Sequence, residues 1–235
     1  SITIKPKPPK VSTSGFVERL KIWKKMSFNI RWNYRDAKRN KLRAVMTIIG
    51  VMGCSALLIG AFGLYDGLED AKDWEYNVIN QYDSMLVIDS NASSSQIDNI
   101  AAEVNGEKIM EGRVEIESGN ENEMGTILVL NETDLISPTD GEKNKIEIGD
   151  GEVSISEKRA KTLGVDIGDK IKWHILGTNK WVETKIDKIH ADPLSQGIIV
   201  NQNKLEDLGL NYTPTNIITS EHVNGTYDGI KSVNT

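Results

Sequence analysis

Cysteine and histidine are scarce in this sequence. Its 235 residues include one cysteine, Cys54, and three histidines, His174, His190 and His222. A disulfide framework needs paired cysteines, and a zinc site needs three or four convergent ligands. We therefore expect no disulfide, no metal site and no bound cofactor. The histidines are assigned structural or surface roles, and Cys54 the role of a small packing residue.

The common motifs of enzymatic chemistry are also missing. The sequence contains no G-x-x-x-x-G-K-[ST] phosphate loop, no G-x-S-x-G nucleophile elbow and no H-E-x-x-H zinc motif. Carboxylates are numerous, but no pair of them is recognisable as an acid/base couple. We expect that the chain is not an enzyme and that it does not hydrolyse nucleotides itself.

Positive charge is confined to the beginning of the chain. Residues 1–43 contain 13 Lys and Arg against 2 Asp and Glu, a net charge of +11, whereas residues 44–235 contain 15 against 32, a net charge of −17. The overall net charge of −6 therefore averages two segments that face different environments. An ordinary apolar content of 38% excludes a wholly disordered chain and a polytopic membrane protein.

One long apolar run stands out. The stretch AVMTIIGVMGCSALLIGAFGLY, Ala44 to Tyr65, has 22 residues without a charge. As an α-helix with a rise of about 1.5 Å per residue it would span roughly 33 Å, which matches a hydrocarbon core of about 30 Å. It is longer than the apolar region of a signal peptide. We predict a transmembrane helix over residues 44–65.

The charges that flank this run predict its orientation. Basic residues precede the helix, and Asp66, Glu69 and Asp70 follow it. By the positive-inside rule the N-terminus is cytoplasmic and residues 66–235 are extracytoplasmic. The residues expected at the membrane interface are Trp23, Arg35, Lys38, Arg39, Lys41 and Arg43.

Small residues form a stripe along the predicted transmembrane helix. They recur at steps of three and four residues, which places them within one arc of the helix surface. Lipid tails pack well against large side chains, so such a stripe favours close packing against other transmembrane helices over simple anchoring. The general enrichment of glycine in membrane helices is the alternative explanation. The helix-packing residues are Gly53, Ala56, Gly60, Gly63 and Gly67.

The cytoplasmic segment, residues 1–43, has two parts. A basic, proline-rich linker, Lys5–Lys10, is followed from Gly15 by a basic amphipathic pattern with aromatic residues. Beside a membrane helix, this pattern is typical of an interfacial elbow on anionic headgroups. A nucleic-acid-binding arm would carry the same charges, but the neighbouring membrane span disfavours it, so we expect no nucleic-acid partner.

The remaining residues predict a stalk and an α+β domain. Apolar residues at helical spacing continue the membrane helix as a stalk over residues 66–83, and residues 84–235 alternate short strands and helices without a regular βαβ rhythm. The last residues are polar and turn-rich and predict no closing element. The expected strands are 85–88, 113–116, 126–130, 170–175, 181–189, 198–200 and 216–219. The expected helices are one that is capped by Ser93 or Ser94 and stops at Asn105–Gly106, one over Glu157–Leu163 and one over Lys204–Leu208.

Several stretches resemble one membrane-protein family. The segment NYRDAKRNKLRAVMTIIGVMGCSALL, Asn33–Leu58, is similar to the entry into the first membrane helix of FtsX-like (MacB-like) ABC transporter permeases of Gram-positive bacteria. Three later stretches resemble the extracytoplasmic domain of that group: GVDIGDKIKWHI…W (Gly164–Trp181), DPLSQGI (Asp192–Ile198) and LEDLGLNYTPT (Leu205–Thr215). The membrane-entry motif is the more specific of these similarities.

The resemblance implies a permease subunit driven by a separate cytoplasmic ABC ATPase. Family permeases carry a large extracytoplasmic domain after the first membrane helix, and three further helices complete them. Motion driven by the ATPase passes through helix and stalk to that domain, for export or mechanotransmission. Since this chain starts at Ser1 rather than Met and ends near the end of that domain, we expect it to be a fragment.

Two other interpretations stay open. The extracytoplasmic domain could act mainly as a sensor that binds a peptide, a lipoprotein or a wall hydrolase and signals inward. Alternatively the chain is a complete single-pass, membrane-anchored binding domain without a transport partner. An enzymatic role ranks third, because nothing supplies a nucleophile with its base.

Overall fold

A computed structural model describes residues 27–39 and 41–235 of the chain. Contacts divide the chain into two compact units, Ser1–Tyr65 and Asp66–Thr235. The proline-rich linker, the first part of the predicted elbow and Trp23 lie outside the described residues.

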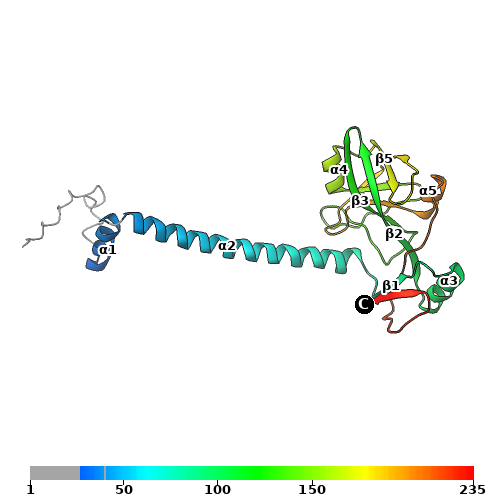
Figure 1. Cartoon of the computed structure of the whole chain (residues 1–235), viewed down its shortest axis with the longest axis horizontal. Helices are drawn as coiled ribbons and strands as arrows, with labels where there is room; N and C mark the ends of the chain where they lie inside the picture. Colours follow the sequence, from blue (N-terminus) through cyan, green and yellow to red (C-terminus); the bar gives the residue numbers. More distant parts are fainter. Residues whose placement is uncertain (1–26, 40) are drawn as a thin grey trace, which may run out of the picture. The chain divides into compact units, whose positions relative to one another are not determined.

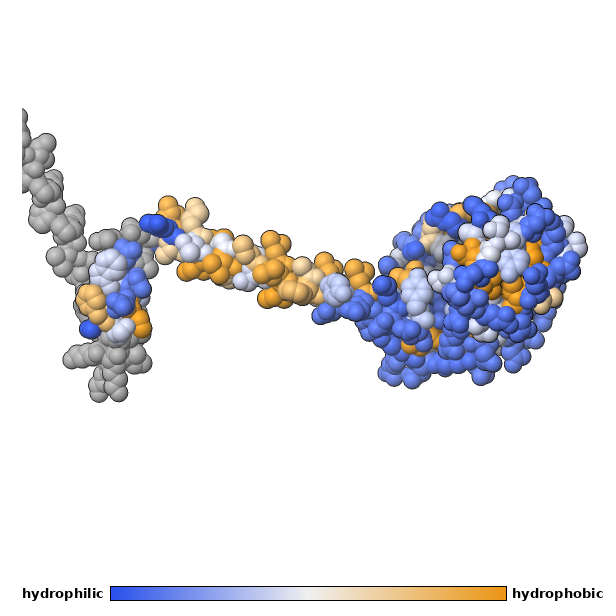
Figure 2. Space-filling view, turned by 90° about the horizontal axis from the view of Figure 1, so that it is seen from below, coloured by the Kyte–Doolittle hydropathy of each residue, from blue (hydrophilic) through white to orange (hydrophobic). Residues whose placement is uncertain are grey.

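Helices α1 (Phe28–Arg39) and α2 (Lys41–Trp74) precede the sheet, and a π-helical turn, η3 (Glu75–Ile79), extends α2. No residue of α2 is buried. The continuous helix Lys41–Ile79 is long and apolar enough to cross a membrane, with a mean hydropathy of 2.2 in its most apolar window. In Figure 2 apolar side chains cover the middle of α2, whereas the face of Asp66–Thr235 seen there is mostly hydrophilic.

The unit Asp66–Thr235 is a mixed α+β domain, which confirms the predicted fold class. Its helices are α3 (Ser94–Glu103), α4 (Glu157–Leu163) and α5 (Gln202–Asp207). Its strands are β1 (Ser84–Ile88), β2 (Glu107–Ser118), β3 (Glu121–Val129), β4 (Val153–Ser156), β5 (Lys170–Ile175), β6 (Val182–Lys185), β7 (Lys188–His190), β8 (Gly197–Val200), β9 (Asn216–Thr219) and β10 (Ile230–Asn234).

The long strand β2 connects the two halves of one sheet. The order is β10-β1-β9-β2-β3-β8-β4-β7, with β5 pairing β2 and β6. The first residues of β2 pair with β9, its last residues pair with β5, and β3 runs antiparallel along most of its length. Figure 1 shows the half with β1 and α3 and the half with β3, β5, α4 and α5 at opposite ends of β2.

Three apolar cores match this division. The largest surrounds Trp173 on β5 and includes α4, α5 and the strands β2 to β8. A second lies between α3 and the strands β1 and β9. A third, smaller core joins Ile79 of η3 to Ile109, Ile136 and Ile218. The end of the helix that begins at Lys41 is therefore part of the core of the domain.

Local sequence signals explain the ends of two helices. Ser93 and Gln96 form a reciprocal capping box at the start of α3. Gly164 ends α4 in the left-handed conformation, with φ of 65°. Ser156 stands directly before α4, at the N-cap position, but its side chain makes no capping hydrogen bond.

The structure differs from the sequence predictions at several places. Strands β2 and β3 begin at Glu107 and Glu121, well before the predicted starts at 113 and 126. The stalk helix ends at Ile79 and does not reach Tyr82. The predicted strand 181–189 is two strands, β6 and β7, and β4 was not predicted. The expectation that the last residues form no closing element is wrong, because β10 pairs antiparallel with β1. The sequence of β10 is only weakly apolar and does not by itself indicate a strand. It forms a strand because β1 offers it a backbone to pair with.

Gly197 permits the parallel pairing of β3 with β8. A Cβ atom at this position would overlap the backbone of Thr126, its direct partner in the register. We expect Gly197→Ala to lower the free energy of unfolding of the domain by about 3 kcal/mol, because the strands would have to separate. Gly141→Ala is the control, since its Cβ would meet only the flexible carboxylate of Glu157 at 3.4 Å. Urea unfolding of the full chain in detergent, followed by circular dichroism, measures both changes, and equal values would contradict this explanation.

Candidate functional site

The stalk joint is the place where the helix enters the domain. We use this name for Trp74, η3 and the residues that they contact. Beside the joint lies a cleft of about 1010 Å³. Its walls come from η3, β2, β3, β8 and the loop between β7 and β8.

Apolar packing and backbone hydrogen bonds hold the end of η3. Ile79 is 5% exposed and lies in the third core. Its carbonyl oxygen accepts a hydrogen bond from the Ser137 amide at 2.8 Å, and the Gln81 amide donates to the Leu135 carbonyl at 2.8 Å. These bonds add a short antiparallel bridge between Asn80 and Ile136. The segment that follows the helix is therefore fixed to the loop after β3.

Trp74 makes the second attachment. Its indole Nε1 donates a hydrogen bond to Thr139 Oγ1 at 2.9 Å, and Thr139 Oγ1 in turn donates to the Ala191 carbonyl at 3.1 Å. The Lys143 ammonium lies 5.2 Å from the centre of the indole ring and 2.8 Å from Asp70 Oδ1. A cation over an indole face and an exposed ion pair each contribute modestly to stability.

Glu75 makes the third attachment, and it is a buried carboxyl group. Its side chain is 8% exposed, and Oε1 accepts a hydrogen bond from Asn80 Nδ2 at 2.8 Å. The Asp192 side chain lies within hydrogen-bonding range of it. Burial, followed by the negative charge of Asp192, raises the pKa of Glu75 to about 7. Burial also raises the pKa of Asp192.

Other titratable groups of the cleft share this low-dielectric environment. Burial raises the pKa of Glu111, although a 2.9 Å hydrogen bond from Asn216 opposes the shift. Burial and the charge of Glu111 raise the pKa of Tyr82 to about 12, so its hydroxyl stays neutral. The cleft thus brings together three carboxyl groups whose negative forms are poorly solvated.

His190 also lines the cleft and is buried. It is 3% exposed, and its Nδ1 forms a 2.8 Å hydrogen bond with Ser154 Oγ. Burial lowers the pKa of His190 to about 4, so the ring is neutral near pH 7. His174 lies on β5, where Nε2 is 3.0 Å from Glu115 Oε2, and this bond raises its pKa.

The predicted helix-packing residues lie together on α2. Gly53, Ala56, Gly60, Gly63 and Gly67 are all exposed, and a Cβ built on any of these four glycines would meet nothing within 4 Å among the described residues. Their role in packing stays a prediction.

The predicted interface residues are described only in part. Lys41 and Arg43 are exposed in the first turn of α2. Arg35, Lys38 and Arg39 belong to α1, but their side chains, like the whole of Trp23, lie outside the described part of the chain.

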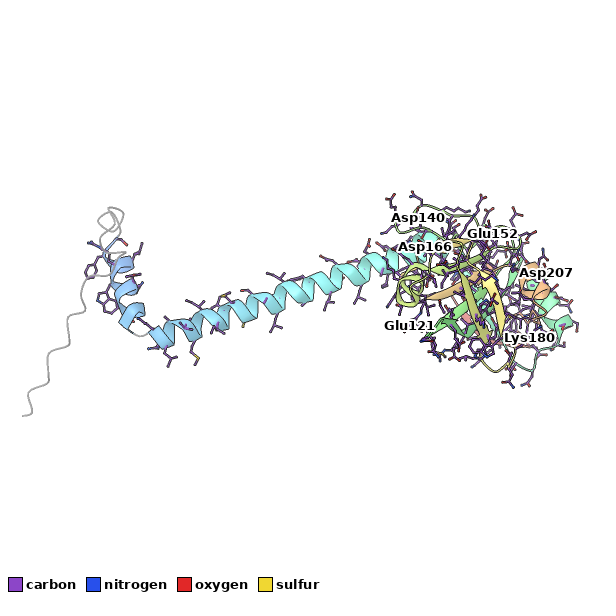
Figure 3. All side chains as sticks on the ribbon, turned by 90° about the horizontal axis from the view of Figure 1, so that it is seen from above. Glu121, Asp140, Glu152, Asp166, Lys180 and Asp207 are labelled. Atoms are coloured by element: carbon purple, nitrogen blue, oxygen red, sulfur yellow. The ribbon has the colours of Figure 1, made fainter. Side chains whose placement is uncertain are left out.

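Several other carboxylates of the domain accept hydrogen bonds from backbone amides of their own loops. Asp140 Oδ1 accepts from the Glu142 and Asn144 amides, and Glu152 Oε2 accepts from the Gly149 amide. The charged residues labelled in Figure 3 are spread over the domain and do not converge on one point. Within residues 27–39 and 41–235, no group of three or more His, Cys, Asp or Glu side chains could hold a metal ion.

The sequence analysis missed the carboxyl pair. Glu75 and Asp192 are far apart in the sequence, so no motif joins them. One signal was present, because Glu75 follows Ala71 and precedes Val78 at helical spacing and so borders the apolar face of the stalk. An acidic residue at that place indicates either a buried partner or a break in the face.

Comparison with known proteins found similarity among solved structures. No protein-family model and no curated protein matches the chain. Among solved structures, the domain is similar to the extracellular domain of the noncanonic ABC-type transporter YknZ from Gram-positive bacteria, with 15% sequence identity and a TM-score of 0.38 over 59% of this chain and 83% of that one. A TM-score of this size does not establish a shared fold, so the proposals below depend on the residues of this chain.

The Trp74 attachment can be tested by removing one hydrogen bond. Trp74→Phe keeps an aromatic ring but loses the Nε1 donor, and we expect the domain to lose about 1 kcal/mol of unfolding free energy. Tyr76→Phe, at a side chain that is 61% exposed, should have no measurable effect. Chemical denaturation of the full chain in detergent compares the two variants. An unchanged stability of Trp74→Phe would show that this hydrogen bond does not hold the joint.

Proposed function

We propose that the chain is the first membrane helix and the extracytoplasmic domain of an ABC transporter permease of the FtsX-like (MacB-like) type. In this proposal a separate cytoplasmic ATPase drives motion that α2 carries to the domain, for export or mechanotransmission. The observation that carries the proposal is one continuous helix whose apolar part is wholly exposed and whose far end belongs to the core of the domain.

The length of the helix supports a mechanical role. At about 1.5 Å per residue, the 34 residues of α2 span roughly 50 Å, which exceeds a hydrocarbon core of about 30 Å. The polar end of α2 is therefore long enough to leave the membrane before it reaches the joint. Since α2 contains no proline, displacement or rotation at one end is transmitted to the other.

The sequence supports the proposed orientation and partners. Lys41 and Arg43 precede the apolar run, whereas Asp66, Glu69 and Asp70 follow it, which favours a cytoplasmic N-terminus and an extracytoplasmic domain. The small-residue stripe favours packing against other transmembrane helices of the same permease. The absence of a phosphate loop from the sequence assigns ATP hydrolysis to a partner subunit, so the chain itself would not be an enzyme.

A second function is favoured by the cleft. Its volume of about 1010 Å³ is sufficient for a small molecule or a peptide segment. In this alternative, the chain is a single-pass anchored sensor whose domain binds an extracellular peptide, a lipoprotein or a wall hydrolase. The two functions differ in whether an ATPase associates with the protein.

Purification of the complete gene product distinguishes them. We expect an affinity-tagged protein, extracted in mild detergent, to retain a stoichiometric partner that carries a phosphate-loop motif. Mass spectrometry of the co-purifying chains identifies it. A tagged protein that purifies alone near 26.1 kDa would contradict the permease proposal and favour the anchored sensor.

The stripe provides a separate test in the intact complex. Gly63→Ile would place a branched side chain where we propose that another helix backbone approaches, so recovery of the ATPase-containing complex should fall about tenfold, equivalent to ~1.4 kcal/mol. Ala61→Ile is the matched control, because Ala61 faces away from the stripe at 100° per residue. Quantitative blotting after affinity purification gives the yields. Equal recovery of the two variants would contradict close packing along the stripe.

A further inference from the structure

The Glu75 carboxyl group has one oxygen atom without a donor. Oε1 accepts from Asn80 Nδ2, but Oε2 is fully buried and meets no hydrogen-bond donor among the described residues. Asp192, another carboxyl group, lines the same cleft and is close enough to share a hydrogen bond with Glu75 when one of the two is protonated. A buried oxygen without a donor costs free energy, so this arrangement needs an explanation.

Asp192 is held in place by its own loop. Its Oδ1 accepts the Leu194 amide at 2.8 Å and also the Ser195 amide, which fixes the carboxyl group at the start of the β7–β8 loop. Two ionised carboxylates contain only acceptors and repel each other. A single proton between them supplies the missing donor and removes one of the two charges.

The attachments of the stalk converge on this loop. Trp74 reaches the Ala191 carbonyl through Thr139, and Glu75 reaches the adjacent residue, Asp192. The Ala191 amide also donates to the Thr139 carbonyl at 2.7 Å. The carboxyl pair is therefore part of the contact between the helix and the domain.

Other titratable groups line the same cleft as the pair. They are Lys72 from the last turns of α2, Tyr76 from η3, Tyr82 and Asp83 from the segment before β1, Glu111 and Arg113 from β2, and His190 from β7. Asn216 already donates to Glu111, so Glu111 does not need a proton to be satisfied. The described hydrogen bonds and ion pairs include no cation bound to Glu75 or Asp192.

We propose that Glu75 and Asp192 share one proton that latches the stalk joint, and that loss of this proton to water frees the β7–β8 loop from η3. The attachment of the helix to the β7–β8 loop would then weaken as the extracytoplasmic pH rises. This inference depends on the geometry of the joint and holds whichever partner α2 has.

The sign of the pH dependence follows from the buried carboxyl group. Because its pKa in the folded protein, about 7, lies above the ordinary value of 4.5, the latch is fully present below pH 4.5 and is lost as pH rises through 7. The opposite trend comes from His190, whose pKa of about 4 lies below its ordinary 6.5, so its stabilisation is lost as pH falls. The histidine of the unfolded chain titrates near 6.5, so the His190 trend extends to about pH 7.5 and stabilises the fold as pH rises; a rise in exchange over this range therefore has the opposite sign and does not come from His190.

Hydrogen–deuterium exchange of the full chain in lipid nanodiscs tests the latch. After correction for intrinsic rates, exchange in residues 75–82 and 190–197 should rise about 30-fold between about pH 5.5 and pH 8. Glu75→Gln mimics the protonated acid, since its amide can accept from Asn80 and donate to Asp192. In this variant the same change in pH should raise exchange less than about threefold.

Glu111→Gln is the matched control, because it removes a buried carboxyl group from the same cleft but not from the pair. It should keep the pH response of the wild-type protein. If Glu75→Gln fails to fold, Asp192→Asn provides the same test from the other side of the contact. A flat wild-type response, or a response that Glu111→Gln abolishes equally well, would overturn the proposal.

Discussion

The burial of Ile79 among Ile109, Ile136 and Ile218 is the contact on which the arrangement of the domain and the helix depends. It joins the last residue of η3 to strands β2 and β9 and to the loop after β3. Because β2 continues from this core into the largest one, the end of the helix is connected through one strand to both halves of the sheet. A force on α2 therefore reaches the domain through packed side chains, which deform little.

The sequence predicted those elements whose signals are local. The helices at Ser94–Glu103 and Glu157–Leu163 carry their own caps and apolar faces, and the hairpin of β5 and β6 has alternating residues on both strands. Elements that depend on distant partners were missed or misjudged. Strand β4 has only four residues, all buried between β8 and β7, and β10 is defined by its pairing with β1.

The same difference between local signals and distant contacts explains how much of the candidate site could be predicted from the sequence. Periodicity could predict that the helix continues beyond Tyr65, because that property belongs to one helix. It could not show where the stalk ends, since Asn80 leaves the helix to pair with Ile136. The proximity of Glu75 to Asp192 depends on the packing of η3 against the β7–β8 loop, and one sequence contains no measure of that distance.

The joint combines contacts that respond differently to pH. Ile79 packing and the hydrogen bond from Trp74 to Thr139 involve no group that titrates near neutrality. The contact between Glu75 and Asp192 requires a proton that is lost in this range. Deprotonation would therefore loosen one attachment while the other two persist, so the helix would change its hold on the β7–β8 loop without leaving the domain. Such partial release would change the strength of the coupling between helix and sheet without breaking it. The packing of Ile79 keeps the helix attached to the domain whether the carboxyl pair is protonated or not.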